Sequence, residues 1–500
     1  MRDIVVGVDA STTAVKAIAF DSSGKPICEA KSSYPLATPK PGHVEQDAED
    51  WWRALSIALK QLTQEVSPAR IAGIALTHQR ETFVLVDKSG QEVRPAILWL
   101  DERSRAEVAE LSGKLGRDNI RDWSGKPPDP TPGLYGLMWL DKFERGSLDK
   151  ADFVADAGTF LHFRLTGERT ASLASADPLG IVDLQARNWR SELVEAAGLD
   201  SSQLPKLIAP AAEVGRVSAE ASQSCGLEEG TPVFGAVGDG QANGLGLGVT
   251  EEGRACLSLG SGVVFGMYVS QYAMSDAYRM LTAPDGKGFM LETVIRSGMQ
   301  LLEWVMHTTK FETVTDIERL ARDVSPGCDG LLTLPYFSGV MSPYWDETAR
   351  GAMIGLSLDH TPGHIYRSAI EAICFEQSIA TASVEESLNV RASNVVASGG
   401  GTNSQLIMQC LTSIMGRPIA ISPVKEAAAL GAAMLAAIGA GWFTDTKQAA
   451  ASMCTEPTEL VEPDLGLVEY YGPLKTVYED LYFELKPTSN ALANLSSQQD

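Results

Sequence analysis

The turn after the first apolar segment carries residues that suit phosphate chemistry. Residues 4–8 form an apolar run that predicts a strand, and residues 15–20 predict its partner after a tight turn. Between them lie one carboxylate and three hydroxyls, namely Asp9, Ser11, Thr12 and Thr13. Backbone N–H and hydroxyl donors in such a turn can surround phosphate oxygens, and Asp9 can hold Mg²⁺. Taken by itself, the pattern also fits the commoner case, a polar hairpin without a ligand.

Three more polar clusters follow apolar strands, where α/β folds place their sites. They are residues 77–82, residues 238–241 and residues 398–404. The last has three successive glycines before an apolar helix, which permits a ligand to approach the backbone closely; a plain strand-to-helix turn is the alternative. Neither a Walker A sequence nor a dinucleotide-binding fingerprint is present, so phosphate binding would depend on the hairpin turns.

Strand-like and helix-like segments alternate along the chain, which predicts an α/β fold. Glu49 to Glu65 reads as an amphipathic helix with Asp47 as its cap. Apolar strands at 255–259 and 263–269 enclose Gly260-Ser261-Gly262 and repeat the pattern of the N-terminus. Strand–turn–strand is the commonest β motif, so the residues alone leave both a duplicated fold and chance similarity open.

The size and charge of the chain limit its partners. Five hundred residues imply two or more domains. The net charge of −23 argues against a nucleic-acid or anionic-membrane partner. The negative charge of the protein also repels polyphosphate. Local hydrogen-bond donors and a metal ion would therefore have to bind it.

The cysteine pattern and the apolar runs indicate a cytoplasmic protein. The seven cysteines are scattered and lack CxxC spacing, which fits a reducing compartment. The sequence opens on a strand, which leaves no room for a signal peptide. The longest apolar run, residues 427–443, is short for a membrane span and is expected to be a buried helix that a neighbour approaches closely. The tail from Pro487 is polar and is expected to be frayed.

Several tracts, in order along most of the chain, resemble the FGGY-family carbohydrate kinases of the actin/hexokinase/Hsp70 ATPase superfamily. They are Asp9 to Lys16, Gln79 to Thr82, Gly238 to Gln241, Leu334 to Gly339, Ser342 to Asp346 with Ala349 to Gly351, and Gly399 to Gly401. The resemblance implies an α/β fold of two ribonuclease-H-like (actin-like ATPase) domains with an interdomain cleft. The resemblance also favours a duplicated fold over chance similarity of the two strand–turn–strand segments. Residues 1–246 would bind the sugar and form the first phosphate turn, residues 247–485 would bind nucleotide, and residues 486–500 would form the frayed tail.

The resemblance also implies roles for individual residues. Asp239 matches the catalytic base, a role that needs a carboxylate to orient an alcohol and accept its proton. Asp9 would lie near the metal. The remaining phosphate and nucleotide positions are the first turn (Ser11, Thr12 and Thr13), the second turn (Gly260 and Ser261), and Gly400, Gly401, Asn403 and Ser404.

The substrate tract resembles that of glycerol kinases. Arg80 and Glu81 match a pair that grips polyol hydroxyls, since arginine donates and glutamate accepts; a surface ion pair is the alternative. Trp99 matches an aromatic wall against the carbon face of the substrate, although a core tryptophan is equally open. Gln241 matches a further substrate contact. Thr131 replaces the tyrosine that is typical of glycerol kinases, so the pocket should be less filled and less aromatic.

The sequence thus predicts a cytoplasmic, ATP- and Mg²⁺-dependent kinase that phosphorylates a terminal hydroxyl of a small polyol or sugar, such as glycerol, a tetritol or a pentitol. A ketopentose kinase of the same family is the first alternative, and a catalytically silent sugar-binding protein with an ATPase fold is the second. The expected partner is the small substrate, without nucleic acid or membrane. A homodimer is compatible with the sequence, which does not reveal the oligomeric state.

Overall fold

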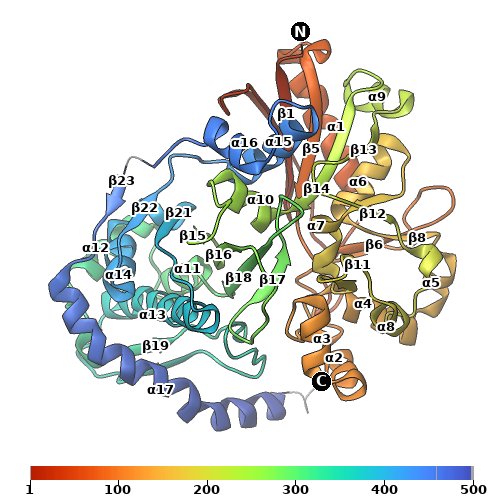
Figure 1. Ribbon diagram of the computed structural model, residues 1–500. Coiled ribbons are helices and arrows are strands. Elements are labelled where there is room, and N and C mark those ends of the chain that lie inside the picture. The colour runs from red at the N-terminus through yellow and green to blue at the C-terminus, as the bar shows by residue number, and fades with distance from the viewer. Residues whose placement is uncertain (1, 458, 497–500) are drawn as a thin grey trace.

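The computed structural model describes residues 2–457 and 459–496, which form two lobes, each built around one large sheet (Figure 1). The first lobe contains the N-terminal strands, and the second contains the strands from residue 254 onward. A long C-terminal helix crosses the outer side of the second lobe (Figure 1).

The sheet of the first lobe has the strand order β13-β14-β5-β1-β2-β3. Strand β2 pairs antiparallel with both β1 and the edge strand β3, whereas β1 pairs parallel with β5 and β5 with β14. In this order the strands span Glu213–Arg216, Pro232–Gly238, Ile71–His78, Ile4–Ala10, Ala14–Phe20 and Pro26–Ser33. The predicted strands of this region are therefore present.

The sheet of the second lobe has the order β17-β18-β16-β15-β21-β22-β23. Strand β15 pairs antiparallel with β16 and parallel with β21, as β1 does with β2 and β5 in the first lobe. In sheet order the strands span Arg279–Thr282, Phe289–Ile295, Val263–Val269, Arg254–Leu259, Asn394–Ser398, Ile419–Ile421 and Glu459–Val461. The shared topology confirms two ribonuclease-H-like halves.

The remaining strands belong to smaller sheets. A four-stranded sheet in the first lobe has the order β4-β7-β6-β8, with bounds Glu45–Gln46, Ala96–Ile97, Phe83–Val86 and Phe153–Asp156. Three two-stranded sheets pair β9 with β12, β10 with β11 and β19 with β20; in chain order these six strands span Thr170–Ser172, Val182–Asp183, Asn188–Trp189, Lys206–Ile208, Leu332–Leu334 and Ala352–Ile354.

Helices surround both large sheets. In the first lobe, α1 (Ala48–Glu65) begins as predicted, because the side chain of Asp47 accepts a hydrogen bond from the backbone N–H of Glu49. The helices α2 to α9 span Arg105–Leu115, Arg117–Ser124, Gly133–Phe143, Arg145–Lys150, Ala157–Thr166, Leu173–Ala176, Ser191–Ala196 and Ala219–Cys225. In the second lobe, α11 to α14 span Met299–Thr308, Val314–Arg322, Pro362–Leu388 and Gln405–Met415.

Two helices cross at the junction of the lobes. Helix α10 (Asp239–Gly246) follows β14, and α15 (Ala427–Gly439) packs both on α10 and on the first sheet. A Cβ atom on Gly431 would lie 2.0 Å from the carbonyl oxygen of Ala242, so the helices meet backbone to backbone. The prediction of a buried helix with a closely approaching neighbour is confirmed. Because α15 and α16 (Thr446–Met453) contribute to the core under the first sheet, the lobes are not divided at one point of the sequence.

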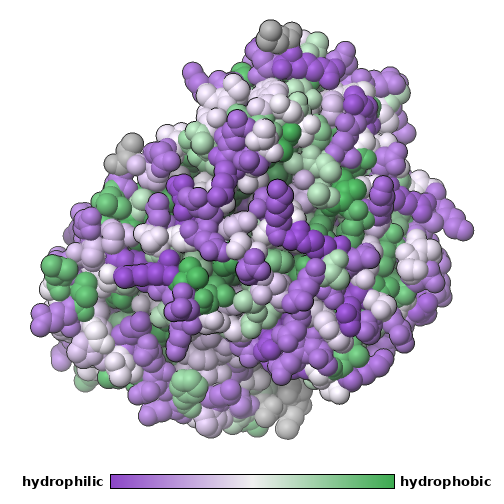
Figure 2. Space-filling model, viewed as in Figure 1, coloured by the Kyte–Doolittle hydropathy of each residue, from purple (hydrophilic) through white to green (hydrophobic). Residues whose placement is uncertain are grey.

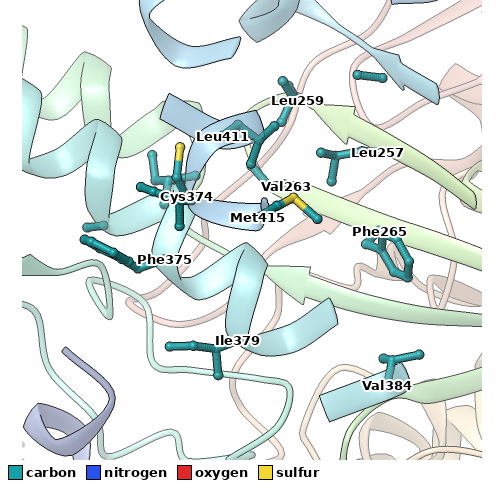
Figure 3. Packing of buried hydrophobic residues seen from close by; sticks show 14 of the residues in the cluster. Leu257, Leu259, Val263, Phe265, Cys374, Phe375, Ile379, Val384, Leu411 and Met415 are labelled. Carbon is teal, nitrogen blue, oxygen red and sulfur yellow. The ribbon is translucent and has the colours of Figure 1, made fainter. Parts of the chain in front are cut away.

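The core of the second lobe is formed between its sheet and two helices. Figure 3 shows Leu257, Leu259 and Phe265 from the strands β15 and β16 in one cluster with Cys374 of α13 and Leu411 of α14. All five side chains are buried. Each fully buried aliphatic or aromatic side chain contributes about 1.5–3 kcal/mol, so this core fixes the helices against the strands that carry the second turn.

The prediction of a frayed tail is wrong over the described residues. Helix α17 spans Leu465–Ser496 and includes the segment from 486 to 496. This segment is attached to the second lobe: the Nζ atom of Lys486 lies 3.8 Å from a carboxylate oxygen of Asp346, and the hydroxyl of Thr348 bonds to Asn490. Residues 497–500 lie outside the described residues.

The surface matches the acidic, polar composition. Figure 2 shows hydrophobic residues in separate patches among hydrophilic ones on the face in view. No helix among residues 2–457 and 459–496 is long and apolar enough to cross a membrane. All seven cysteines are free.

A buried carboxyl group in the second lobe predicts a pH-dependent stability. Glu376 of α13 accepts hydrogen bonds from the hydroxyls of Tyr336 (2.7 Å) and Tyr478 (2.9 Å), and its burial raises its pKa to about 7. A carboxyl whose pKa is raised in the folded state stabilises the fold most at acidic pH, and this stabilisation is lost as the pH rises toward 7. We therefore compare the melting temperature of Glu376→Gln with that of the wild type at each pH. This difference should be more favourable to the variant at pH 8 than at pH 5, by on the order of a few degrees.

Differential scanning fluorimetry between pH 5 and 8 measures this effect. Glu385→Gln is the matched control, because Arg417 and the backbone N–H of Ala392 lower the pKa of Glu385, which therefore stays ionised over the whole range. If the difference in melting temperature between Glu376→Gln and the wild type were the same at every pH, the prediction would be contradicted.

Candidate active site

Asp239 lies at the point where the buried strand β14 becomes helix α10. Its Oδ1 atom accepts a hydrogen bond from the backbone N–H of Gly240 (2.8 Å), and its side chain is 44% exposed. An accessible carboxylate fixed at a strand end can meet a hydroxyl group without first breaking out of the core.

Two cavities adjoin at the site: the smaller lies between the lobes, and the larger is lined by residues of the second lobe. The smaller cavity, about 350 Å³, is lined by Asp239 together with Arg80, Glu81, Trp99 and Thr131, among others. The larger cavity, about 750 Å³, is lined among others by residues of the second turn and of the glycine-rich segment, namely Gly260, Ser261, Gly400, Gly401, Asn403 and Ser404. Ser261 lines both cavities, so the two spaces adjoin at the second turn.

The predicted pair Arg80–Glu81 is held by residues of the second lobe. The Nη1 atom of Arg80 donates to Oε2 of Glu292 on β18 (2.6 Å), and its Nε atom lies 2.8 Å from Oδ1 of Asp239. Glu81 accepts from Nη1 of Arg279 on β17 (2.8 Å). Arg279 also donates to Glu292 through Nε (3.2 Å) and Nη2 (3.0 Å). We call this chain of five side chains, Asp239, Arg80, Glu292, Arg279 and Glu81, the ion-pair cluster.

The two glycines beside Asp239 are required by the ion-pair cluster. A Cβ atom on Gly240 would lie 2.2 Å from Oε1 of Glu292, and one on Gly238 would lie 2.4 Å from Cδ of Arg80. Both distances are far below van der Waals contact. The arginine and the glutamate therefore lie directly against the backbone that carries Asp239.

The backbone at Glu81 adopts a rare conformation. Its φ is +62°, and the backbone N–H of Thr82 donates to the carbonyl of Arg80 (2.7 Å), which closes a turn of three residues. A non-glycine residue with positive φ costs of order 1–3 kcal/mol and persists where surrounding contacts enforce it. Here those contacts include the ion pair with Arg279, which aims the Glu81 carboxylate at the smaller cavity.

The first turn closes as predicted and is joined to the smaller cavity. The hydroxyl of Ser11 donates to the carbonyl of Ala14 (3.0 Å) and so holds the turn together. The hydroxyl of Thr12 accepts a hydrogen bond from the indole Nε1 of Trp99 (3.1 Å). Thr13, the third hydroxyl, is exposed. Trp99 is 38% exposed and lines the cavity, so it is not a core tryptophan.

Asp9 lies at the end of β1 with an unsatisfied carboxylate oxygen. Its Oδ1 atom is enclosed and has no hydrogen-bond partner among residues 2–457 and 459–496. Burial, together with the nearby carboxylates of Asp239 and Glu426, raises the pKa of Asp9 to about 7, and Lys16 opposes the shift. A buried carboxylate beside two others is a site that a cation would stabilise.

The prediction that Gln241 contacts substrate is corrected by the structure. Its side chain is fully buried, and its Nε2 atom donates to the backbone carbonyls of Ala174 (2.9 Å) and Thr282 (3.3 Å). Gln241 thus ties helix α10 to neighbouring elements beneath the cavity.

Sequence reasoning missed the second-lobe side chains of the site. Arg279 and Glu292 belong to the ion-pair cluster, and Arg296 closes the cavity by donating to Asp129 (2.6 Å) and to the hydroxyl of Thr131 (3.2 Å). One signal was present in the sequence: Arg279 and Glu292 are the only charged residues of the mostly apolar strands β17 and β18. A buried charge needs a partner, and those two strands are neighbours.

Comparison with known proteins identifies the family. The model of the N-terminal domain of the FGGY family of carbohydrate kinases matches residues 4–246, and the model of its C-terminal domain matches residues 255–440. The chain belongs to the FGGY family. This confirms the resemblance, the two-domain actin-like ATPase fold, and a phosphotransferase that acts on an alcohol group.

Individual relatives align over nearly the whole chain. A xylulose kinase of Lactococcus lactis subsp. lactis (strain IL1403) is 27% identical over 500 residues, 99% of each chain. A glycerol kinase of Geobacillus sp. (strain WCH70) is 28% identical over 466 residues, 90% of this chain and 93% of the relative. The solved structure of xylulose kinase from Rhodospirillum rubrum is 27% identical, with a TM-score of 0.89 over 97% of this chain and 99% of that one.

The close approach at Gly240 predicts the effect of adding one methyl group. Gly240→Ala should displace the Glu292 side chain and lower the free energy of unfolding by about 1–3 kcal/mol, the usual cost of overpacking. Activity should fall as well, because Arg80 moves with Glu292. Denaturant unfolding and initial rates measure the two effects.

Gly113→Ala is the control for Gly240→Ala. Gly113 also lies inside a helix, but nothing is within 4 Å of its Cβ position, so alanine there should stabilise the helix. Equal effects of the two substitutions would show that the contact with Glu292 is unimportant.

Proposed function

We propose that the protein transfers the terminal phosphoryl group of ATP to a hydroxyl of a small neutral polyol or sugar. The observation that carries this proposal is that Asp239 lines the smaller cavity, which adjoins the larger one at Ser261. A hydroxyl bound in the smaller cavity would give its proton to Asp239 as it attacks a phosphoryl group held at the second turn.

The larger cavity suits the nucleotide. Gly400 leaves room beside the backbone, because no described atom lies within 4 Å of its Cβ position, and Asn403 offers an amide that can bond to a base. The Cβ position of Gly401 is instead closed by Leu259 (2.7 Å). Tyr366 and Ile407 add apolar surface to the lining. The second turn would contact the phosphates from one side through Ser261, because the backbone N–H of Gly260 already donates to the carbonyl of Gly262 (3.1 Å). The first turn, at Thr12 and Thr13, would contact them from the other side.

Asp9 fits a magnesium ion in the same arrangement. Mg²⁺ in phosphoryl-transfer sites is held by one or two carboxylates, with waters and phosphate oxygens completing its shell. The enclosed, unpartnered Oδ1 atom of Asp9 is such a ligand. When bound, the ion would neutralise charge on the phosphates in a protein whose net charge is −23.

The charges of the smaller cavity favour a neutral acceptor over a sugar acid. Three guanidinium groups line it, and each is already paired with a carboxylate: Arg80, Arg279 and Arg296. Four carboxylates line it as well: Glu81, Asp101, Glu102 and Asp239. Asp101 and Glu102 are paired in turn with Arg103 and Arg105. Because each of the three guanidinium groups already has a carboxylate partner, a carboxylate on the substrate would find no unpaired guanidinium group among these described lining residues.

A ketopentose is the second candidate acceptor. A relative named xylulose kinase aligns over 99% of this chain, as much as any polyol kinase among the relatives described. Arg80 and Glu81 offer donors and acceptors that suit the hydroxyls of either class.

Removing the carboxylate charge of Asp239 tests the assignment of the base. Asp239→Asn should lower kcat on the order of 10²–10⁴-fold, because the amide cannot accept the proton of the hydroxyl. ATP binding, measured by isothermal titration calorimetry, should be retained. Asp359→Asn, an exposed aspartate in a loop of the second lobe, is the control. Turnover near that of the wild type in Asp239→Asn would refute the assignment.

A panel of acceptors in a coupled ADP assay tests the substrate class. Polyols and ketoses of three to six carbons should stimulate ADP release, and the rate without acceptor should be low. Gluconate and glucitol form a matched pair, because they share a six-carbon skeleton and differ in one terminal carboxylate. Glucitol should be the better acceptor of the two; a preference for gluconate would overturn the argument from charge.

A further inference from the structure

We propose that Glu292 is a positioning residue for the phosphoryl transfer, which acts from the second lobe on the catalytic carboxylate of the first. Glu292 acts on Asp239 through Arg80, which forms ion pairs with both carboxylates. This inference rests on the proposed function, since it concerns how the base of that reaction is oriented.

Glu292 is the anionic centre of the ion-pair cluster. Its Oε2 atom accepts one hydrogen bond from Arg80 and two from Arg279, at 2.6, 3.2 and 3.0 Å. The Glu292 side chain is 1% exposed, and the two guanidinium groups hold its pKa below the ordinary range. Three charge-assisted bonds to one enclosed oxygen fix the planes of both guanidinium groups.

Fixing Arg80 also fixes the cationic group that forms an ion pair with Asp239. The Nε atom of Arg80 lies 2.8 Å from Oδ1 of Asp239 while its Nη1 atom is held by Glu292. The Cδ atom of Arg80 packs over Gly238 and its guanidinium carbon over Gly240, so the arginine covers the backbone on both sides of the base. A shift of Arg80 would therefore move the partner of Asp239 and the surface beside it.

The cluster also joins the lobes. Arg80, Glu81 and Asp239 belong to the first lobe, whereas Arg279 and Glu292 lie on adjacent strands of the second. The bonds Arg80–Glu292 and Glu81–Arg279 thus cross the cleft at the floor of the smaller cavity. The base has this environment only while the lobes are closed, which couples closure to readiness for transfer.

Glu292→Gln is the direct test, because glutamine keeps the shape of the side chain and removes its charge. We expect kcat to fall on the order of 10- to 100-fold, as for a misplacement of about 1 Å, and KM for the acceptor to rise. KM for ATP should stay unchanged, because Glu292 does not line the larger cavity. Substitution of a residue that only supports the fold would not raise KM for the acceptor while leaving KM for ATP unchanged.

Two further variants keep the result interpretable. Glu385→Gln removes a carboxylate that is paired with Arg417 in the same lobe but belongs to neither cavity lining, so it should lower stability and leave both KM values unchanged. The double variant Glu292→Gln with Arg279→Gln removes one charge of each sign and is compared with Arg279→Gln alone, because Arg279 also lines the cavity and holds Glu81. If Glu292→Gln alone unfolds, the double variant should fold and still show the low kcat and the high acceptor KM, because Arg80 has lost its anchor.

The possible results separate the two proposals. A wild-type kcat and acceptor KM in Glu292→Gln, or in the double variant, would overturn the positioning role and leave the kinase assignment intact. Equal increases in KM for ATP and for the acceptor would also overturn it. A wild-type protein that phosphorylates no polyol, ketose or sugar acid would overturn the proposed function, and the inference with it.

Discussion

The ion-pair cluster between the lobes is the interaction on which the rest of the site depends. Charged groups enclosed in protein are costly unless each finds a partner, and breaking one buried pair typically costs 3–5 kcal/mol. Here two arginines and three carboxylates form ion pairs with one another, and Arg80 and Glu81 of the first lobe find partners, Glu292 and Arg279, on the second. The acceptor cavity is consequently complete only where the two lobes meet.

The same cluster explains why small residues surround Asp239. The glycines at 238 and 240 let Arg80 and Glu292 lie against the backbone that carries the base. A glycine permits close packing at the junction of α10 and α15 as well, where Gly431 lies against the backbone of Ala242. Helix α10 thus begins at the base and packs on the helix that connects the lobes, and the site is continuous with the junction.

Several parts of the fold and the site could be predicted from the sequence. Apolar runs with polar turns located the paired strands of both halves, and the Asp47 cap located the start of α1. The tail was predicted wrongly because its composition is polar, whereas its helix is fixed by contacts to Asp346 and Thr348 that lie far away in the sequence. Gln241 was misplaced for a related reason: its position beside Asp239 does not reveal that its side chain turns under the cavity.

The sequence by itself determined the family, the duplicated α/β architecture and the position of Asp239, because these depend on local patterns and ordered motifs. Only the tertiary structure decided what surrounds Asp239. Arg279 and Glu292 lie about 200 residues from Arg80 and Glu81 along the chain, and no local pattern links residues so far apart. Their pairing follows from the packing of two lobes, because buried charges are matched in space and not along the chain.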